Sequence, residues 1–511
     1  MSEAAPQPPQ GRAATPQGNF GSVAAKGSFI NTTQWLLNKV ATAAAMLLIA
    51  HYLKPDDYGV ASQALAIAQF LVVFFPLTMG DVLIAHPRSF ERLVPTARRL
   101  AMVIGIATCV LMLATIPVFL GIYSKYPAAW LGGLLAVAAL RPVLDAALMV
   151  PLARLRTALA YRRIALIDGA VQLGATVLSL AFAAFGLRSA SLVAPQVIGT
   201  GARALWYRRV ASGVRTGRYH RTLAAILMRA YLPAASAQYL HNVIVMLEVL
   251  VLGYVSGEYQ TGLFGFAFTI AAQANTVVAY QLGVVLQPIF GHLQGDPERQ
   301  VNGFLRVQRV LGLVCVPISL TQAMLAEPLF RVAFAERYLP AVPVFQVISV
   351  AQAFYFATGP SMSCLRSQRR FATFFKWQGV QFVLSLPLYW AGAQWWGALG
   401  ASIASGVAWA ISAPIVVWLC TRVVKGKRVR EVLSIFVKPW LVSLPIFAAA
   451  TLAIRWLAQF GKAGDFASLL VLGPVVAMVA IGASRLVDGE MRKLSDKALV
   501  AVKAKLLRKR G

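Results

Sequence analysis

Charged residues are scarce in this chain, and acidic residues are the scarcest. Charged residues make up 13% of the 511 residues, with 18 Asp and Glu against 48 Lys and Arg. An average soluble domain carries about 25% charged residues, so this composition excludes an ordinary water-soluble fold. Hydrophobic residues make up 58% of the chain, and the mean hydropathy is +0.67. They come in blocks of about 20, the length of a helix that crosses roughly 30 Å of hydrocarbon. The sequence therefore predicts an all-α polytopic membrane protein.

Cysteine and catalytic motifs are also lacking. The four cysteines lie in or beside apolar segments, with no C-x-x-C or Cys/His spacing: Cys109, Cys315, Cys364 and Cys420. Neither disulfides nor a metal site are therefore expected. The chain contains no P-loop and no nucleophile motif of the G-x-S-x-G kind. We therefore expect no enzyme, no cofactor and no direct use of ATP.

The net charge of +30 raises the question of a nucleic-acid partner. The cations, however, form short clusters between apolar blocks rather than one soluble face. This distribution is typical of membrane topology signals and of contact with anionic lipid headgroups, and it argues against nucleic acid.

Apolar windows predict about fourteen transmembrane helices. They cover residues 29–53, 60–84, 100–122, 128–151, 164–186, 190–207, 231–255, 261–290, 307–327, 342–364, 372–393, 398–420, 434–457 and 465–484. Residues 1–28 are rich in Pro, Gln, Gly and Ala and predict a disordered cytoplasmic tail. Residues 487–511 form a second, basic cytoplasmic tail.

The loops alternate in charge. Loops after even-numbered helices are arginine-rich, as with Arg208, Arg209 and Arg215 after the sixth. Loops after odd-numbered helices contain few Lys or Arg residues, and Lys125 is a typical single example. By the positive-inside rule, the even-numbered connections and both termini are cytoplasmic. The alternation independently favours an even number of helices.

An internal repeat of about 200 residues divides the chain. The stretch HYLKPDDYGVASQALAIAQ resembles GYVSGEYQTGLFGFAFTIAAQ, so that Tyr52 falls on Tyr254 and Gly59 on Gly262. This offset covers six helices, so both halves enter the membrane in the same sense. We expect an N-lobe at 29–225, a C-lobe at 226–424 and two additional helices at 425–486. Two facing lobes indicate an alternating-access transporter.

Several stretches resemble one family. They include LKPDDYGVASQALAIAQF, ARLRTALAYRRIALIDGAVQLGATVLSLAFAAFG, QPIFGHLQGDPERQ and LFRVAFAERYLPAVPVFQVISVAQAF. They are similar to the bacterial polysaccharide flippases, the Wzx-like transporters of the multidrug/oligosaccharidyl-lipid/polysaccharide exporter superfamily. The resemblance covers nearly the whole chain apart from its ends.

The resemblance implies a V-shaped protein of the bacterial inner membrane. Such a flippase passes an undecaprenyl-diphosphate-linked oligosaccharide repeat unit from the cytoplasmic to the periplasmic leaflet. The polymer could be an exopolysaccharide, a capsule or lipopolysaccharide O-antigen. A polysaccharide polymerase and chain-length or export machinery are the protein partners that it implies.

Polar residues deep in the first and seventh helices are candidates for the transport path, because such residues usually face a cavity. They are Asn31, Gln34, Asn38 and Lys39 in the first helix, and Gln238, His241 and Glu248 in the seventh. By the repeat, His241 corresponds to Lys39, although Lys39 could instead snorkel to headgroups. Glu248 is the deepest acid in the chain, which suggests coupling to H+ or Na+. A static pair with His241 or with a cation of the other lobe is the alternative.

The fourth and eighth helices add further candidates. Arg141 and Asp145 are spaced i, i+4, and Arg141 is our choice for a diphosphate contact. An intrahelical salt bridge would explain the pair equally well. Asp145 is a second candidate for ion coupling. Gln273 and Asn275 suit sugar hydroxyls or interhelical hydrogen bonds. Four further charged residues lie near the predicted cytoplasmic ends of helices, where topology and interface anchoring explain them: Asp81, Asp168, Arg203 and Lys376.

Two other functions remain open at this point. A small-molecule or drug exporter of the same superfamily would share the fold and the repeat, although a cationic interior disfavours cationic drugs. A membrane polymerase or ligase of lipid-linked glycans would need larger outward loops than KPDDY, YSKYP or GLRSA.

Overall fold

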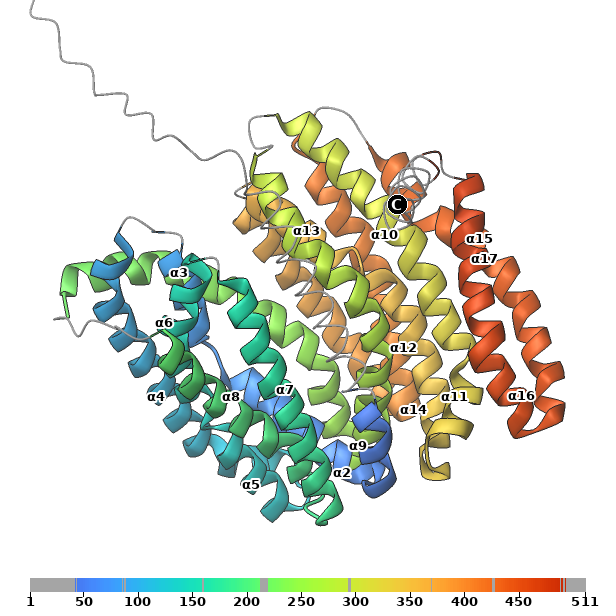
Figure 1. Ribbon diagram of the computed structural model, residues 1–511, viewed down its shortest axis with the longest axis horizontal. Helices are drawn as coiled ribbons and strands as arrows, with labels where there is room; N and C mark the ends of the chain where they lie inside the picture. The colour runs from blue at the N-terminus through green and yellow to red at the C-terminus, as the bar shows by residue number, and fades with distance from the viewer. Residues whose placement is uncertain are drawn as a thin grey trace, which may run out of the picture.

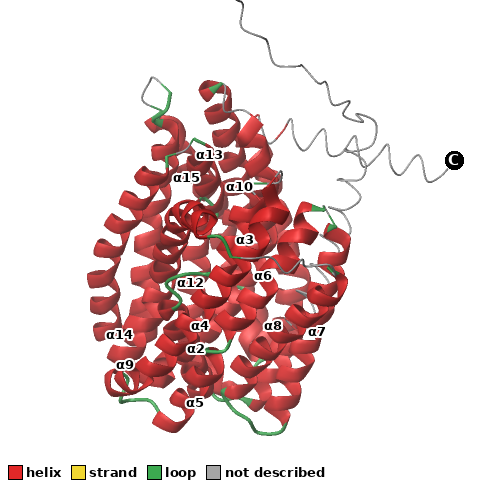
Figure 2. Ribbon diagram, turned by 90° about the vertical axis from the view of Figure 1, so that its left-hand side faces the viewer, coloured by secondary structure: helices red, strands yellow, loops and turns green. Residues whose placement is uncertain are grey.

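The computed structural model describes residues 42, 44–84, 86, 89–158, 160–211, 219–292, 296–368, 370–424, 428–487, 489 and 492. This part of the chain is almost entirely helical and contains no strand, as expected (Figure 2). After a first helical stretch at 44–52, the helices are α2 (Pro55–Leu71), α3 (Pro76–Ile84), α4 (Phe90–Ile122), α5 (Ala128–Ala138), α6 (Arg141–Thr157), α7 (Tyr161–Ala184), α8 (Ala190–Val210), α9 (Arg221–His292), α10 (Pro297–Met324), α11 (Ala326–Ala333), α12 (Val342–Tyr355), α13 (Thr358–Ser367), α14 (Phe371–Thr421), α15 (Val429–Leu457), α16 (Lys462–Ala467) and α17 (Gly473–Val487). Short 3-10 helices η2 (Glu336–Ala341) and η3 (Ala458–Phe460), and a π-helical turn η4 (Ser468–Leu472), join them.

The chain is a multi-pass membrane protein. Within the described residues, nine helical segments are long and apolar enough to cross a membrane, or ten with α2 and α3 taken as one bent span. Two of these segments contain two expected spans each, because the hairpin turns are so short that the helices run together. α9 is broken only at Gly257, whose φ is 81°, and α14 at Trp396 and Gly397. Most of the first expected span lies outside the described residues, and the total of fourteen stays a prediction.

One expected helix is sharply bent, and two others are interrupted by a two-residue turn but still form single apolar segments. The helix expected at 60–84 is α2 and α3, bent by 53°. Pro76 opens α3, and it explains the break because it lacks an N–H and drives the preceding residue out of the helical region. The helix expected at 128–151 is α5 and α6, and the helix expected at 342–364 is α12 and α13.

The helices form two bundles. In Figure 1, α4 to α8 lie in one bundle and α10 to α17 in the other, with α2 and α9 between them. The first turns of α9 pack on the first bundle, where Leu227, Tyr231 and Ala235 join a core with α3, α4 and α6. Further along, α9 packs against α12 and α14 of the second bundle. α15 and α17, which lie outside the repeat, pack on α10 at the far edge.

The repeat is visible where α2 meets α9. A Cβ built on Gly59 would lie 1.9 Å from the Glu258 carbonyl oxygen, and a Cβ on Gly262 would lie 1.8 Å from the Pro55 carbonyl oxygen. Gly59 and Gly262 are 203 residues apart, and so are Pro55 and Glu258. Such reciprocal contacts are those of two copies related by a two-fold axis. They confirm the predicted pairing of Gly59 with Gly262, and only glycine allows the two helices to approach so closely.

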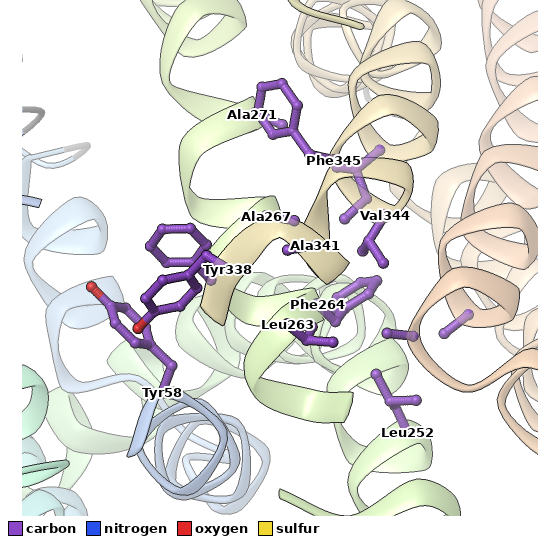
Figure 3. Packing of buried hydrophobic residues seen from close by; sticks show 14 of the residues in the cluster. Tyr58, Leu252, Leu263, Phe264, Ala267, Ala271, Tyr338, Ala341, Val344 and Phe345 are labelled. Carbon is purple, nitrogen blue, oxygen red and sulfur yellow. The ribbon is translucent and has the colours of Figure 1, made fainter. Parts of the chain in front are cut away.

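We call the contact between α2 and α9 the seam. An aromatic core fills it and extends to η2. Tyr58 of α2 meets Phe266 of α9 edge-on at a centroid distance of 5.2 Å, and Phe266 stacks on Tyr338 of η2 at 4.1 Å. Figure 3 shows Tyr58 beside Tyr338. All three side chains are buried. The seam therefore combines close backbone packing with aromatic contacts, and it joins the two bundles firmly at this end.

Candidate functional site

A cavity of about 530 Å³ lies at the inner face of the first bundle. Its walls come from the stretch at 44–52, α2, α7 and α8, with Arg141 at the start of α6 and Thr269 from the second half of α9. Its polar lining residues are Thr42, Ser62, Arg141, Gln172, Thr176, Ser179, Gln196, Thr200, Arg203 and Thr269. The contribution of Thr269 means that the cavity faces α9 as well as the first bundle.

Two polar stripes line this cavity. Gln172, Thr176 and Ser179 are spaced i, i+4, i+7 on α7, and Gln196, Thr200 and Arg203 repeat this spacing on α8. Residues at these intervals share one face of a helix. Part of this hydrogen-bonding capacity is used within α8, where Gln196 donates to the Leu192 carbonyl and Thr200 donates to the Gln196 carbonyl. The remaining amide and hydroxyl groups give the cavity a hydrogen-bonding surface inside an apolar bundle.

Two arginines give the cavity its cations. Arg141 Nε lies 3.8 Å from Asp145 Oδ2, and Arg203 Nε lies 3.3 Å from Asp168 Oδ1. Both ion pairs use the Nε side of the guanidinium group. In the part of the chain that the structure describes, no other ion pair engages either arginine. The paired Nη groups, which suit bidentate contacts to phosphate oxygens, therefore stay available to a ligand.

The structure gives Arg203 a position that the sequence did not predict. We expected Arg203 to anchor the helix near the cytoplasmic interface. In the structure it is the fourteenth residue of α8 and lines the cavity together with Arg141. The signal that would have found it is the stripe of Gln196, Thr200 and Arg203 on an otherwise apolar helix.

The expected residues of the first helix cannot be placed. Asn31, Gln34, Asn38 and Lys39 lie outside the described residues. The same helix reaches the cavity further along, through Thr42, Ala45, Met46 and Ile49.

Glu248 lies in the second bundle, away from this cavity. Its side chain is 3% exposed and sits between α9 and α14. Tyr389 and Ser405 donate their hydroxyl groups to Glu248 Oε1 at 3.1 and 2.9 Å. These two hydroxyl groups are the partners that the structure gives Glu248, and the alternative pair with His241 stays a prediction. The structure thus shows a buried carboxyl group held by hydroxyl groups.

The remaining candidates are not brought together at one site. Gln238 donates to Asn242 Oδ1 at 3.1 Å, a contact within α9. His241 is half-buried on the same helix. Gln273 follows Thr269 by one helical turn and so lies on its face. Asn275 lies in the helical part of α9, but its side chain is outside the described structure.

Two cation contacts close the seam at one end. Lys125, in the turn after α4, donates to the Val255 carbonyl at 2.5 Å. Arg337, in η2 of the second bundle, donates to the Ala50 and His51 carbonyls. Each cation therefore caps the C-terminal end of the first helix of the opposite repeat, where the helix dipole favours positive charge. We call these two contacts the clasps.

Tyrosine hydroxyl groups reinforce both clasps. Tyr123 donates to the Leu250 carbonyl at 3.1 Å, Tyr126 to Thr261 Oγ1 at 2.9 Å, and Tyr338 to the Leu53 carbonyl at 3.0 Å. Burial raises the pKa of Tyr123 to about 12 and also raises the pKa of Tyr126. Both groups therefore remain protonated donors at physiological pH.

A known protein family matches this sequence. The family model described as "Polysaccharide biosynthesis protein" matches residues 48–343, more than half of the chain. The chain belongs to this polysaccharide biosynthesis protein family. The matched region contains the whole first bundle from residue 48, both clasps and the glycine contacts of the seam.

The curated relatives of this chain are distant. It is 24% identical over 199 residues to the lipopolysaccharide biosynthesis protein WzxC of Escherichia coli strain K12, covering 39% of this chain and 40% of the relative. It is 24% identical over 161 residues to the succinoglycan biosynthesis transport protein ExoT of Rhizobium meliloti strain 1021, covering 32% of each chain. The matches thus span well under half of these relatives.

Solved structures share the fold of this chain. The lipid II flippase MurJ in an inward closed conformation matches with a TM-score of 0.68 at 12% identity, covering 90% of this chain and 100% of MurJ. An inward-facing multidrug resistance transporter of the MATE family matches with a TM-score of 0.62 at 12% identity, covering 78% and 96%. The predicted two-lobed exporter fold is therefore confirmed.

Proposed function

We propose that this protein is a flippase for a lipid-linked oligosaccharide. It moves an undecaprenyl-diphosphate-linked repeat unit from the cytoplasmic to the periplasmic leaflet of a bacterial inner membrane, for the synthesis of a surface polysaccharide. Its family, the names of its relatives and the fold shared with a lipid II flippase support this proposal. The observation that carries it is the polar cavity with two arginines inside an apolar bundle.

The cavity matches the chemistry of this substrate. The diphosphate is anionic, and the Nη groups of Arg141 and Arg203 supply donors in the fork geometry that binds phosphate oxygens. Asp145 and Asp168 hold the two guanidinium groups in place before the substrate arrives. The amide and hydroxyl stripes on α7 and α8 then offer partners for sugar hydroxyls. A cationic drug would meet the same arginines as a repulsive charge, so the cavity favours the flippase over a drug exporter.

The closed seam identifies the side of the membrane toward which the transport path is closed. By the charge alternation of the loops, the clasp end faces the periplasm and both termini are cytoplasmic. The structure then corresponds to a state closed toward the periplasm. Release to the outer leaflet requires both clasps and the glycine contacts to separate, and the reciprocal contacts make a rigid rocking of the two bundles the simplest motion.

Glu248 is our candidate for ion coupling. A buried carboxyl group held by hydroxyl groups exchanges charge most cheaply by binding a proton or Na+. Asp145 is the second candidate, although its contact with Arg141 suits the positioning role better. Coupling to H+ or Na+ would supply the driving force. A polysaccharide polymerase and export machinery would be partners through removal of the product.

The test is complementation of a deletion strain. We expect deletion to remove the surface polysaccharide and to leave lipid-linked repeat units on the inner leaflet, and the wild-type gene to restore export. Arg141→Gln and Arg203→Gln should each restore much less at equal protein level. Arg162→Gln, at an exposed cytoplasmic arginine outside the cavity, is the matched control and should restore fully. Normal polymer in the deletion strain, with no second flippase present, would refute the proposal.

A further inference from the structure

Three ion pairs in the first bundle lie one after another. Two of them, Arg141 with Asp145 and Arg203 with Asp168, hold the arginines of the cavity. The third joins Arg156 Nη1, in the last turn of α6, to Asp81 Oδ1 of α3 at 3.2 Å. We call the three pairs the charge ladder. Its members, in order, are Arg141, Asp145, Arg203, Asp168, Arg156 and Asp81.

The three pairs are also linked to one another. Asp145 interacts electrostatically with Arg203 as well as with Arg141. Asp168 interacts electrostatically with Arg156 as well as with Arg203. Arginines and aspartates therefore alternate along the ladder, and each charge has neighbours of the opposite sign. Because a charge inside an apolar bundle is costly, this alternation allows three guanidinium groups to lie within the bundle.

The ladder runs from the cavity to the cytoplasmic end of the first bundle. Arg141 and Arg156 stand fifteen residues apart on α6, which corresponds to a rise of about 22 Å. Arg141 lies near the middle of the apolar segment Ala128–Thr157, and Arg156 lies at its end. The loop after this segment is cytoplasmic by the charge alternation. Arg156 therefore lies at the level of the cytoplasmic headgroups, and Arg203 lies between the two arginines of α6.

Arg156 is accessible to a ligand that comes from this side. Its side chain is 45% exposed, compared with 32% for Arg203. Asp81 engages one Nη group of Arg156, and the guanidinium group has further N–H donors for phosphate oxygens. The neighbouring Arg154 is paired with Glu91 at 2.6 Å, and the ladder itself holds three positive and three negative charges. An incoming phosphate therefore exchanges with a carboxylate at one arginine and does not depend on an excess of positive charge.

We propose that Arg156 is the entry contact for the diphosphate of the transported lipid, and that the charge ladder passes this diphosphate to Arg203 and then to Arg141. The inference rests on the proposed flippase function and adds a binding site before the cavity. The diphosphate arrives at the level of the headgroups, because its isoprenoid chain stays in the bilayer. There it takes the place of Asp81 on Arg156. Each later step exchanges one carboxylate for a phosphate oxygen, so the diphosphate always has a guanidinium partner on its way inward.

The experiment measures how fast a polyprenyl diphosphate binds and leaves. The purified full chain is immobilised in neutral detergent for surface plasmon resonance, with geranylgeranyl diphosphate as the probe and geranylgeraniol as the phosphate-free control. Arg156→Gln should lower the association rate about tenfold and leave the dissociation rate unchanged, because a charge at the mouth of a site acts on the encounter. Arg203→Gln should instead raise the dissociation rate, because Arg203 lines the cavity. Arg156→Lys keeps the charge and should recover most of the association rate.

Asp81→Asn separates an entry contact from a purely structural pair that fastens α3 to α6. It breaks the same ion pair as Arg156→Gln but keeps the arginine, so association should be as fast as in the wild type or faster. Arg98→Gln, at an exposed arginine of α4 outside the ladder, is the matched control and should leave both rates unchanged. An equal loss of association in Asp81→Asn or Arg98→Gln, or no loss in Arg156→Gln, would overturn the entry role alone. A wild-type chain that binds geranylgeraniol as well as geranylgeranyl diphosphate would instead refute the flippase proposal on which the inference rests.

Discussion

Replacement of Gly59 by alanine places a methyl group inside the seam between α2 and α9. The new Cβ would lie 1.9 Å from the Glu258 carbonyl oxygen, whereas an unstrained carbon–oxygen contact is about 3.3 Å. The helices must therefore separate by about 1.4 Å, or the backbone must bend. This contact lies between two backbones, so no side-chain rotation relieves it.

The cost falls on the closed state alone. Overpacking of this kind costs about 1–3 kcal/mol. The gain in helix propensity from glycine to alanine is the same in both states and cancels. A difference of about 2 kcal/mol lowers the ratio of closed to open seam roughly thirtyfold. A seam that is open about 1% of the time would then be open about a quarter of the time.

The assay follows the reactivity of a cysteine placed in the seam. Thr261 is fully buried beside Tyr126, so Thr261→Cys should resist a membrane-impermeant maleimide added from the periplasmic side. Adding Gly59→Ala should speed labelling roughly twenty-five-fold, in proportion to the rise of the open fraction from about 1% to about a quarter. Gly133→Ala is the control, because a Cβ on Gly133 meets nothing within 4 Å. Unchanged labelling in the Gly59→Ala variant, or an equal rise with Gly133→Ala, would refute the reasoning.

Three further predictions test the clasps and the buried acid. Combining Lys125→Gln with Arg337→Gln removes both caps, so periplasmic labelling of the seam should rise more than with either change alone; strictly independent effects would argue against a coupled closure. Tyr126→Phe removes one buried hydrogen bond and should favour the open seam by about 1 kcal/mol, measured with the reporter cysteine at the buried Ala267 because Thr261→Cys would itself remove the acceptor of that bond; unchanged labelling would show that the bond does not hold the seam closed. Glu248→Gln keeps a hydrogen-bonding carbonyl group but cannot ionise, so protein level should hold while export loses its dependence on the ion gradient; export in vesicles that still follows the gradient would remove Glu248 from coupling.

The amino-acid sequence alone was sufficient for the membrane class, the helical fold and the repeat. Apolar blocks of membrane length can satisfy their backbone hydrogen bonds in lipid only as helices. These properties therefore depend on short stretches of sequence and can be predicted from them. The pairing of Gly59 with Gly262 could also be predicted, because the two glycines occupy equivalent positions in the two repeats. Arg141 was found because a cation within an apolar helix must face something polar.

Only the tertiary structure decided which polar residues meet. Gln172 on α7 and Arg203 on α8 lie 31 residues apart in the chain, and no sequence spacing relates two residues on different helices. Packing of the two helices turns them toward one cavity. The clasps depend in the same way on backbone carbonyls, which carry no sequence signal, at helix ends of the opposite repeat. The spacing of residues along a helix determines which face of the helix each one occupies. What that face contacts depends on how the helices and the two bundles pack. For this physical reason the site could not be predicted from the sequence.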